Sequence, residues 1–312
     1  MTTTFQSLFP TIADLMQYAP GVETSNSVDD YAPSGAIAIK KITSIIPATI
    51  LDKIATVPDS SAAGQTSPSL LAALKQAVAN ATLAQHLVFD SVNRRKSGTD
   101  VYKYEIEAMR RSYTESYLAA MDTLLSLLAD DEDFLSSRFG QLLSSCKIKT
   151  CEQMDTIYPI DLSYLFFYRS LPLQRESLSE RLAPYYEKLS PVPTSSAAAT
   201  VPGSFAAGQS QSQSPHLATL DLALAKSTIA KALRRFDIME LPSTMRNLLD
   251  DSTASRSGKD ERTAALDLAL QLEADVNTLL DSLDVVLADT LTNDFTSTSA
   301  YNDPSDLIIM AP

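Results

Sequence analysis

Several short patterns occur twice along this chain, in the same order and at offsets that run only from 144 to 155 residues. Two have helical spacing: Ala79-x-x-Thr82-Leu83-Ala84-x-x-Leu87 returns as Ala225-x-x-Thr228-Ile229-Ala230-x-x-Leu233, and Met121-Asp122-Thr123-Leu124-Leu125 returns as Val276-Asn277-Thr278-Leu279-Leu280. The other two are a loop, Ala62-Ala63-Gly64-Gln65-Thr66 against Ala206-Ala207-Gly208-Gln209-Ser210, and an opening, Phe9-Pro10 against Tyr158-Pro159. A tandem duplication accounts for such a series, and repeats of this kind decide the fold.

Each repeated unit is expected to be helical. The chain has 312 residues, enough for about two domains, and 45% of them are hydrophobic, enough for a core in each. It contains only 8 Gly and no Trp. Ala and Leu are abundant, a composition typical of helices joined by Ser-, Thr- and Pro-containing loops. The predicted fold is all-α, with two tandem helical bundles.

The hydrophobic spacing predicts the same series of elements in each unit: a short helix, a kinked helix, a loop, an Ala-rich helix and a long helix. In the first unit, residues 1–143, helices are expected at 11–18, 35–56 with a break at Pro47, 69–98, 99–128 and 134–143. In the second unit, residues 144–295, they are expected at 177–189 with Pro184 in the place of Pro47, 217–236, 241–251 and 260–289. The aromatic stretch 158–168 reads as a strand or as a short buried helix, and the repeat favours a helix after Pro159. A tail, 296–312, follows.

The charge of the chain argues against tight binding of nucleic acid. Its net charge is −13 and its isoelectric point about 4.6, whereas gripping phosphates needs a surface of Lys and Arg. The basic clusters at 93–96, Arg110-Arg111 and Arg234-Arg235 are few, so ion pairing within the chain or between subunits is expected of them. An acidic wall could instead let nucleic acid pass without sticking.

No constellation of residues points to catalysis, a metal or a cofactor. The two histidines, His86 and His216, lack a partner at metal spacing, and no phosphate-binding loop or nucleophile motif occurs. Cys146 and Cys151 without a nearby His suggest neither a disulfide scaffold nor zinc. The acidic run 130–133 lacks the ligand spacing of a calcium loop and reads as a solvated helix cap that a basic partner could meet. The predictions are no enzyme activity, no cofactor and no metal.

The sequence shows neither a signal peptide nor a membrane span. The N-terminus lacks a basic region followed by an apolar run. No stretch approaches the ~18 to 20 apolar residues that a membrane span needs. A soluble protein synthesised in the cytosol, without a membrane partner, is expected.

Three kinds of segment are candidates for contact with partners. They are the repeated loops, the aromatic stretch and the apolar part of the tail: Ala62, Gly64, Gln65, Ala206, Gly208, Gln209, Tyr164, Phe166, Phe167, Leu307, Ile308 and Ile309. For the aromatic stretch the alternative is the core that joins the two units, since aromatic residues are enriched both in interiors and at interfaces.

One long segment resembles a known family. The pattern Tyr102-x-Tyr104-Glu105-x-x-x-Met109-Arg110-Arg111-Ser112-Tyr113-x-x-x-Tyr117-x-x-Ala120-Met121-Asp122-x-Leu124-Leu125 is similar to proteins of about this length from phages and prophages of gut Bacteroidetes, the crAss-like phages among their relatives. An aromatic stretch follows in that family too, as Tyr158-Pro159 to Tyr168 does in this chain. The resemblance covers most of the chain, and the low-complexity insertion 194–216 departs from it.

The resemblance implies a neck, or head-completion, protein of a tailed phage. Such helical connectors form rings, usually twelve-fold, beneath the portal. This implies a dodecamer of the chain, contacts with the portal protein and with other neck or tail proteins, and DNA that passes through the lumen without specific binding. The protein would be assembled in the host cytoplasm and located in the virion. The alternative is a non-viral helical adaptor that binds partner proteins.

Overall fold

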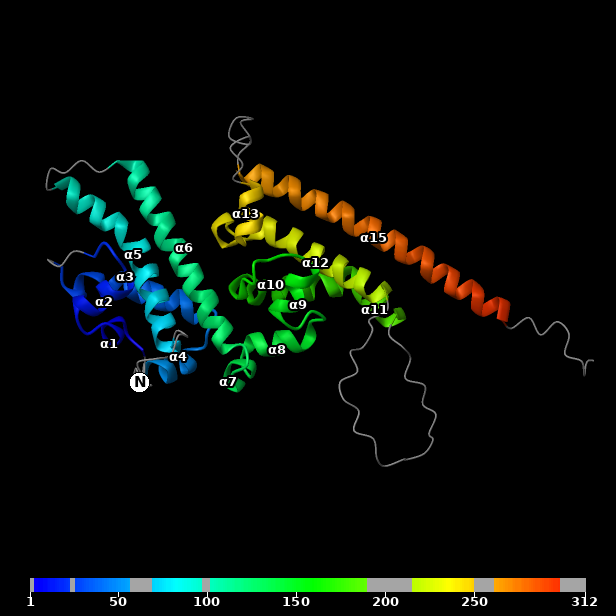
Figure 1. Ribbon diagram of the computed structural model, residues 1–312, viewed down its shortest axis with the longest axis horizontal. Helices are drawn as coiled ribbons and strands as arrows, with labels where there is room; N and C mark the ends of the chain where they lie inside the picture. Colours follow the sequence, from blue (N-terminus) through cyan, green and yellow to red (C-terminus); the bar gives the residue numbers. More distant parts are fainter. Residues whose placement is uncertain are drawn as a thin grey trace, which may run out of the picture.

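The computed structural model describes residues 3–22, 26–56, 69–96, 102–189, 215–249 and 261–297, and every regular element within these ranges is a helix (Figure 1). The all-α class expected from the sequence is confirmed. The buried side chains form one connected hydrophobic core that runs through both halves of the chain. The repeated loops and the tail lie outside the described residues.

The first lobe is built around a central Ala-rich helix, α5. Its helices are α1 (Phe5–Leu8), α2 (Ile12–Tyr18), α3 (Val28–Thr43), α4 (Ala48–Thr56), α5 (Leu70–Lys96) and α6 (Lys103–Leu128). Helix α5 packs most extensively on α6, and also on α3, α2 and α4. Two short helices, α7 (Glu132–Leu135) and α8 (Arg138–Ser145), then lead into the second lobe, where α8 packs on α10.

The second lobe is built around α12. Its elements are α9 (Cys151–Ile157), α10 (Tyr164–Ser177), the π-helical turn η1 (Leu178–Leu182), α11 (Ala183–Leu189), α12 (Pro215–Arg235), the 3-10 turn η2 (Ile238–Glu240), α13 (Ser243–Leu249) and α15 (Glu261–Ser297). Helix α12 packs most extensively on α15, and also on α10, α9 and α11. Each central helix thus packs most extensively on the long helix that follows it and also on several shorter helices that precede it.

One pair of repeated residues, Thr82 and Thr228, has the same environment in the two lobes. The Thr82 hydroxyl donates to the Val78 carbonyl at 2.6 Å and that of Thr228 to the Leu224 carbonyl at 2.8 Å, and both side chains are fully buried. The second lobe differs in having η2 and α13 between α12 and α15. The opening repeat precedes α2 in the first lobe and α10 in the second, so the duplication stays a prediction.

Polar caps explain where several helices begin. The Thr11 side chain accepts a hydrogen bond from the backbone N–H of Asp14 at 3.2 Å, and the Asp14 carboxylate accepts one from the Thr11 N–H at 3.0 Å. Thr150 caps α9 and Ser163 caps α10 in the same way, each accepting a backbone N–H three residues on. These caps satisfy donors that the first turn of a helix leaves unpaired.

Two prolines behave differently from the sequence-based prediction. The helix expected from residue 35 begins at Val28, because Ser27 and Asp30 form a capping box, and Pro33 lies inside it. Pro184 was expected to break a helix as Pro47 does. At Pro47 the chain does bend, by 116° between α3 and α4. At Pro184 the helix continues, because the preceding turn η1 is widened and the Ala183 N–H bonds back to the Leu178 carbonyl.

The aromatic stretch is helical and buried. Residues 164–177 form α10, with Phe166 and Phe167 each only 1% exposed. The Tyr168 ring packs edge-on against Phe134 of α7, with ring centroids 5.1 Å apart. A strand at this position is therefore excluded, and α9 is a helix that the sequence did not predict.

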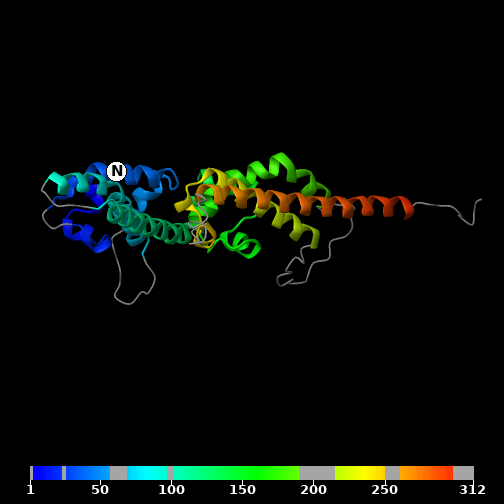
Figure 2. The ribbon, with the colours of Figure 1, turned by 90° about the horizontal axis from the view of Figure 1, so that it is seen from above.

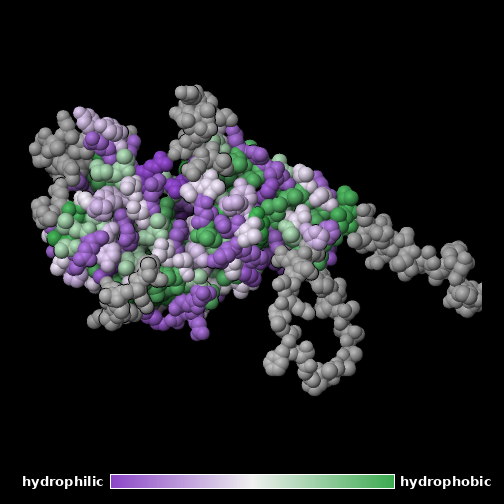
Figure 3. Space-filling model, viewed as in Figure 1, coloured by the Kyte–Doolittle hydropathy of each residue, from purple (hydrophilic) through white to green (hydrophobic). Residues whose placement is uncertain are grey.

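The molecule is elongated (Figures 1 and 2), and in Figure 1 α15 borders the upper side of the second lobe. With 37 residues, α15 is about 55 Å long and continues past the end of α12. Exposed apolar residues Leu266, Leu270 and Val285 lie along it, and Figure 3 shows hydrophobic surface near its far end. Among the described residues, no single helix has the length and apolar character of a membrane span, although the bent pair α3 and α4 passes on length and composition when taken together.

Candidate functional site

A cavity lies between the two lobes. It has a volume of about 470 Å³ and is lined by α3, α5 and α6 of the first lobe and by the η2 segment of the second. Its apolar wall includes Ile37, Ala84 and Met239. A second cavity of about 170 Å³ shares Lys41, Tyr117 and Glu240 with it. Hydrophilic residues border this region on the face seen in Figure 3.

The charged lining of these cavities contrasts with the acidic chain. Four cationic side chains and three carboxylates line the two cavities: Lys41, Arg110, Arg111, Arg169, Glu107, Asp237 and Glu240. In a chain of net charge −13, a local excess of cations marks a place where an anion would be attracted.

Lys41 lies where the two cavities meet. Its ammonium sits over the Tyr117 ring, 4.6 Å from the centroid. It donates no hydrogen bond to any of the residues that the structure describes. Desolvation by the surrounding protein lowers the pKa of Lys41, and the Glu240 carboxylate partly opposes that effect. A carboxylate or phosphate beside this ammonium would restore the interactions that it lost to burial.

Tyr117 supplies a buried polar group at the same place. The residue is 2% exposed, and its hydroxyl finds no hydrogen-bond partner within the described ranges. Desolvation raises the pKa of this phenol well above its ordinary value, so it stays protonated and able to donate. An unpaired buried hydroxyl is costly and is compensated when a ligand provides an acceptor.

Arg169 and Glu240 close the site from the second lobe. Their side chains form an ion pair, and the Arg169 guanidinium also lies over the Phe236 ring, 4.8 Å from its centroid. Glu240 is held by the η2 turn, whose first residues Asp237 caps by accepting the Met239 N–H at 2.9 Å. Because Glu240 is already paired with Arg169, Lys41 and Arg110 are the cations without an ion-pair partner among the described residues.

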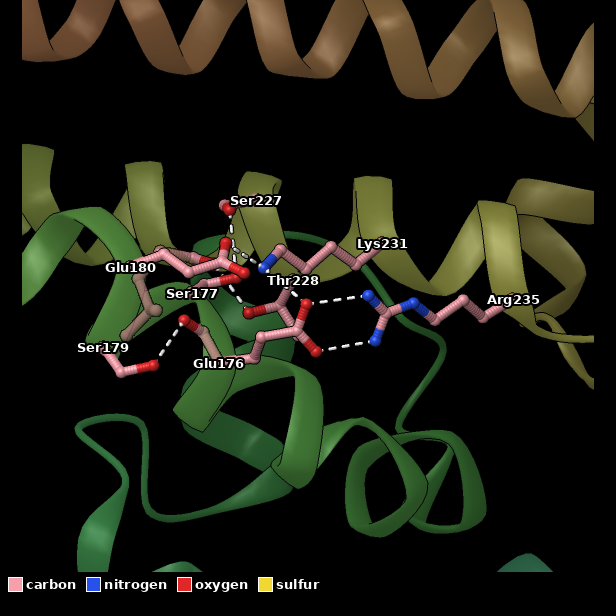
Figure 4. Close-up of polar contacts among 9 residues, drawn as sticks. Glu176, Ser177, Ser179, Glu180, Ser227, Thr228, Lys231 and Arg235 are labelled. Carbon is pink, nitrogen blue, oxygen red and sulfur yellow. Dashed lines mark hydrogen bonds and ion pairs between the residues drawn. The ribbon is translucent and has the colours of Figure 1, made fainter.

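A second polar cluster joins α10 and η1 to α12 (Figure 4). Glu176 accepts from both guanidinium nitrogens of Arg235, at 2.6 and 2.7 Å, and from Lys231 at 3.0 Å. Lys231 also pairs with Glu180 at 2.5 Å. Hydrogen bonds from Arg235 and then Lys231 lower the pKa of Glu176 to about 2. Since two cations balance two carboxylates, this cluster fastens helices and leaves no charge for a ligand.

Several members of the basic pairs and of the acidic run are paired within the chain. Arg234 pairs with Glu273 at 2.7 Å, as was expected of such clusters. The acidic run caps the beginning of α7, where the Asp131 carboxylate accepts the Phe134 N–H at 2.9 Å. Its basic partner is Lys53 of α4, which pairs with Asp133. The reading as a cap after the preceding helix was therefore wrong, because the run serves the next helix.

The residues weighed for chemistry lie apart from the cavity. His86 is partly exposed and packs on the Tyr31 ring, 4.4 Å between centroids, and desolvation lowers its pKa. Cys146 and Cys151 are buried free thiols, and desolvation raises the pKa of both. Within the described ranges, no group of His, Cys, Asp or Glu is arranged to hold a metal ion.

The predicted interface residues do not come together. Phe166 and Phe167 lie in the core, which favours the alternative that the aromatic stretch joins the two units and corrects their assignment to an interface. Tyr164 is partly exposed, and its hydroxyl donates to Glu152 within the chain. The other candidates lie outside the described residues: Ala62, Gly64, Gln65, Ala206, Gly208, Gln209, Leu307, Ile308 and Ile309.

Sequence reasoning missed the cavity residues. Tyr117 belongs to a tyrosine run that reads as helix packing, and Lys41 follows Lys40 near a helix end. Arg169 and Glu240 are 71 positions apart and carry no motif. One sequence feature could have pointed to the site: Lys41 stands between Ile39 and Ile42, in the strong apolar periodicity of the first unit, where a partly buried lysine is expected.

Comparison of the chain with protein-family models, with curated proteins and with solved structures finds no match in any of the three.

Proposed function

We propose that this chain is a structural subunit of a phage neck, forming a head-to-tail connector ring beneath the portal. The observation that carries the proposal is the match between an all-helical, elongated, strongly acidic chain and what such a ring requires. A rigid helical body spans neighbours, and a negative surface lets DNA pass because like charge repels phosphate. The resemblance of residues 102–125 to phage proteins supplies the context.

The proposed role is non-catalytic. The described lining of the cavity between the lobes holds cations, a phenol and carboxylates, of which Glu240 is paired with Arg169, and shows no nucleophile beside a base. Its partners would be further copies of the chain in a twelve-fold ring, the portal protein and other neck or tail proteins. The location is the virion, after assembly in the host cytoplasm, and no membrane or cofactor takes part.

The ring is tested by single-particle imaging and mass photometry of the purified chain, alone and with the portal protein. A closed ring and the presence of the chain in purified particles are expected. A chain that stays monomeric with the portal protein present, and that is absent from particles, overturns the proposal.

A further inference from the structure

The groove between the lobes is suited to a peptide that carries a carboxylate next to apolar residues. Lys41 and Arg110 supply cations without ion-pair partners among the described residues, and Tyr117 supplies a buried hydroxyl without an acceptor. On the apolar side Ile37 is 54% exposed, and Met239 faces the same cavity. A small inorganic anion would leave this apolar surface uncovered.

One segment of the chain beyond the described residues has that composition. Residues 306–310 read Asp-Leu-Ile-Ile-Met, a carboxylate followed by four apolar residues. Residues 190–214 carry no charge at all, and 57–68 and 250–260 hold carboxylates without a following apolar run. The 306–310 segment is therefore the best complement to the groove within the chain itself.

The geometry argues against docking of this segment in its own groove. The groove includes η2, directly before α13, and α13 packs beside the first turns of α15 (Figure 1). Helix α15 then runs about 55 Å away to Ser297. Asp306 lies nine residues beyond Ser297, and nine fully extended residues span at most about 32 Å. The segment thus falls short of its own groove, so a contact with this groove has to come from another copy.

We propose that residues 306–310 of one copy dock in the groove between the lobes of the next copy. The Asp306 carboxylate pairs with Lys41 and Arg110 and accepts from the Tyr117 hydroxyl, and the apolar residues cover Ile37 and Met239. Such a contact joins different surfaces of the two copies, so it is heterologous and closes into a ring when the rotation allows. The inference rests on the proposed function in that both need copies of the chain to associate.

The test uses a fluorescein-labelled peptide of residues 302–312 and fluorescence anisotropy. The receptor is the full-length chain with Asp306→Asn, so that its own tails compete less for the groove. Binding that weakens at least tenfold with Lys41→Gln is expected. The same loss is expected when the peptide carries Asp306→Asn, and combining the two changes should give little further loss, as for groups that contact each other.

Two matched variants keep the result specific. Lys75 also lies over a tyrosine ring, that of Tyr18 at 5.8 Å, but outside the groove, so Lys75→Gln should leave peptide binding unchanged. Tyr117→Phe removes only the hydroxyl and should weaken binding several-fold in a chain that still folds. Circular dichroism of every variant checks folding.

Three outcomes overturn the inference: no binding up to about 1 mM peptide, equal binding by the Lys41→Gln receptor, or full displacement of the peptide by equimolar acetate or phosphate, which would make the groove a small-anion site.

Mass photometry distinguishes a failure of the tail docking from a failure of the proposed function. If the Lys41→Gln variant forms rings as readily as the unchanged chain, the tail docking is wrong and the proposed neck role is unaffected. Peptide binding by a chain that never forms rings sinks the neck role instead.

Discussion

The Asp122 carboxylate of α6 accepts the backbone N–H of Leu165 at 2.8 Å, so a side chain of the first lobe caps the buried helix of the second. The Ser163 hydroxyl donates to the same carboxylate at 3.1 Å. Among the described residues of the first lobe, Asp122 provides a side-chain acceptor for this turn. The Asp122 carboxylate therefore adds a polar link to the apolar packing of α10 on α6, next to the site where Lys41 and Tyr117 meet Arg169.

Replacing Asp122 with Asn is expected to change how stability depends on pH. Burial raises the pKa of Asp122 above its ordinary value, although its hydrogen bonds with Leu165 and Ser163 lower it. A raised carboxyl pKa means that the folded state holds the proton more tightly, so stability falls as pH rises from about 4 through the raised value. Asp122→Asn keeps an acceptor for Leu165 and lacks this loss. In urea denaturation between pH 4 and 8, the free energy of unfolding of the variant should rise relative to that of the unchanged chain as the pH increases.

Asp122→Ala is the control for the cap itself. It removes the acceptor, so a loss of about 1–3 kcal/mol at every pH is expected. If the Asn variant and the unchanged chain keep a constant difference over this range, the carboxylate is not desolvated as the structure indicates.

The Glu176 cluster should act in the opposite direction. The pKa of the Glu176 carboxyl is lowered to about 2. The stabilisation by this group is therefore fully present at a pH above the ordinary pKa of a glutamate, and it is lost as pH falls from about 4 toward 2. Glu176→Gln should lower the free energy of unfolding at pH 7 by about 1 kcal/mol, a figure reduced for partial exposure. The difference should shrink on acidification, as followed by thermal melts from pH 7 to 3.

A second pair between charged helices provides the comparison. Glu273 pairs with Arg234, and both side chains are more than a third exposed. Glu273→Gln should therefore change stability by less than about 0.5 kcal/mol at pH 7. Equal effects of the two variants would contradict a special role for Glu176 in fastening α10 to α12.

Tyr117→Phe is expected to raise the stability of the free chain. The buried hydroxyl has no partner in the described part of the molecule, so removing it relieves a desolvation cost of roughly 1 kcal/mol. The melting temperature should rise slightly. A clear loss of stability would mean that the hydroxyl is hydrogen-bonded in the folded chain, for example to water.

Gly140 tolerates no side chain. A Cβ at this position of α8 would lie 1.7 Å from the backbone carbonyl oxygen of Leu135, the last residue of α7. Gly140→Ala should therefore cost about 2 kcal/mol or more, because backbone must move. Gly35 is the contrasting case, since its Cβ would meet the Phe5 side chain at 2.3 Å, and a side chain can shift more readily. Denaturation of both variants should rank Gly140→Ala as the more damaging.

The sequence predicted the long helices well and the prolines poorly, for a physical reason. The apolar periodicity of residues 99–128 and 260–289 follows the buried face of each helix. Helix α6 therefore ends as expected and α15 begins as expected, but α15 continues to Ser297, past the predicted end at 289. Pro184 carries the same local signal as Pro47. The difference is the π-helical turn before Pro184, in which the hydrogen bonds are shifted so that the missing N–H of the proline does not end the helix. Local helix propensity does not predict such a turn.

The cavity could not be predicted because its parts carry no shared pattern. Lys41, Tyr117 and Arg169 lie on three helices, and Glu240 is placed by a three-residue turn. Their proximity follows from the packing of α6 on α10 and on η2, which is a tertiary property. The repeat is the sequence feature that links distant parts of the chain. It indicates which positions of the two units correspond, and it does not indicate which residues are in contact.

The matching threonines offer a test of the duplication in solution. Thr82 and Thr228 are both fully buried and bond to the carbonyl four residues before. Changing either to Ser keeps this hydroxyl but deletes a buried methyl, at about 1 kcal/mol. Equivalent packing predicts nearly equal losses from Thr82→Ser and Thr228→Ser in urea denaturation. Thr278→Ser, which alters a threonine that bonds to Ala274 on an exposed face, should change little. A large loss at one buried position and none at the other would show that the two lobes pack their central helices differently.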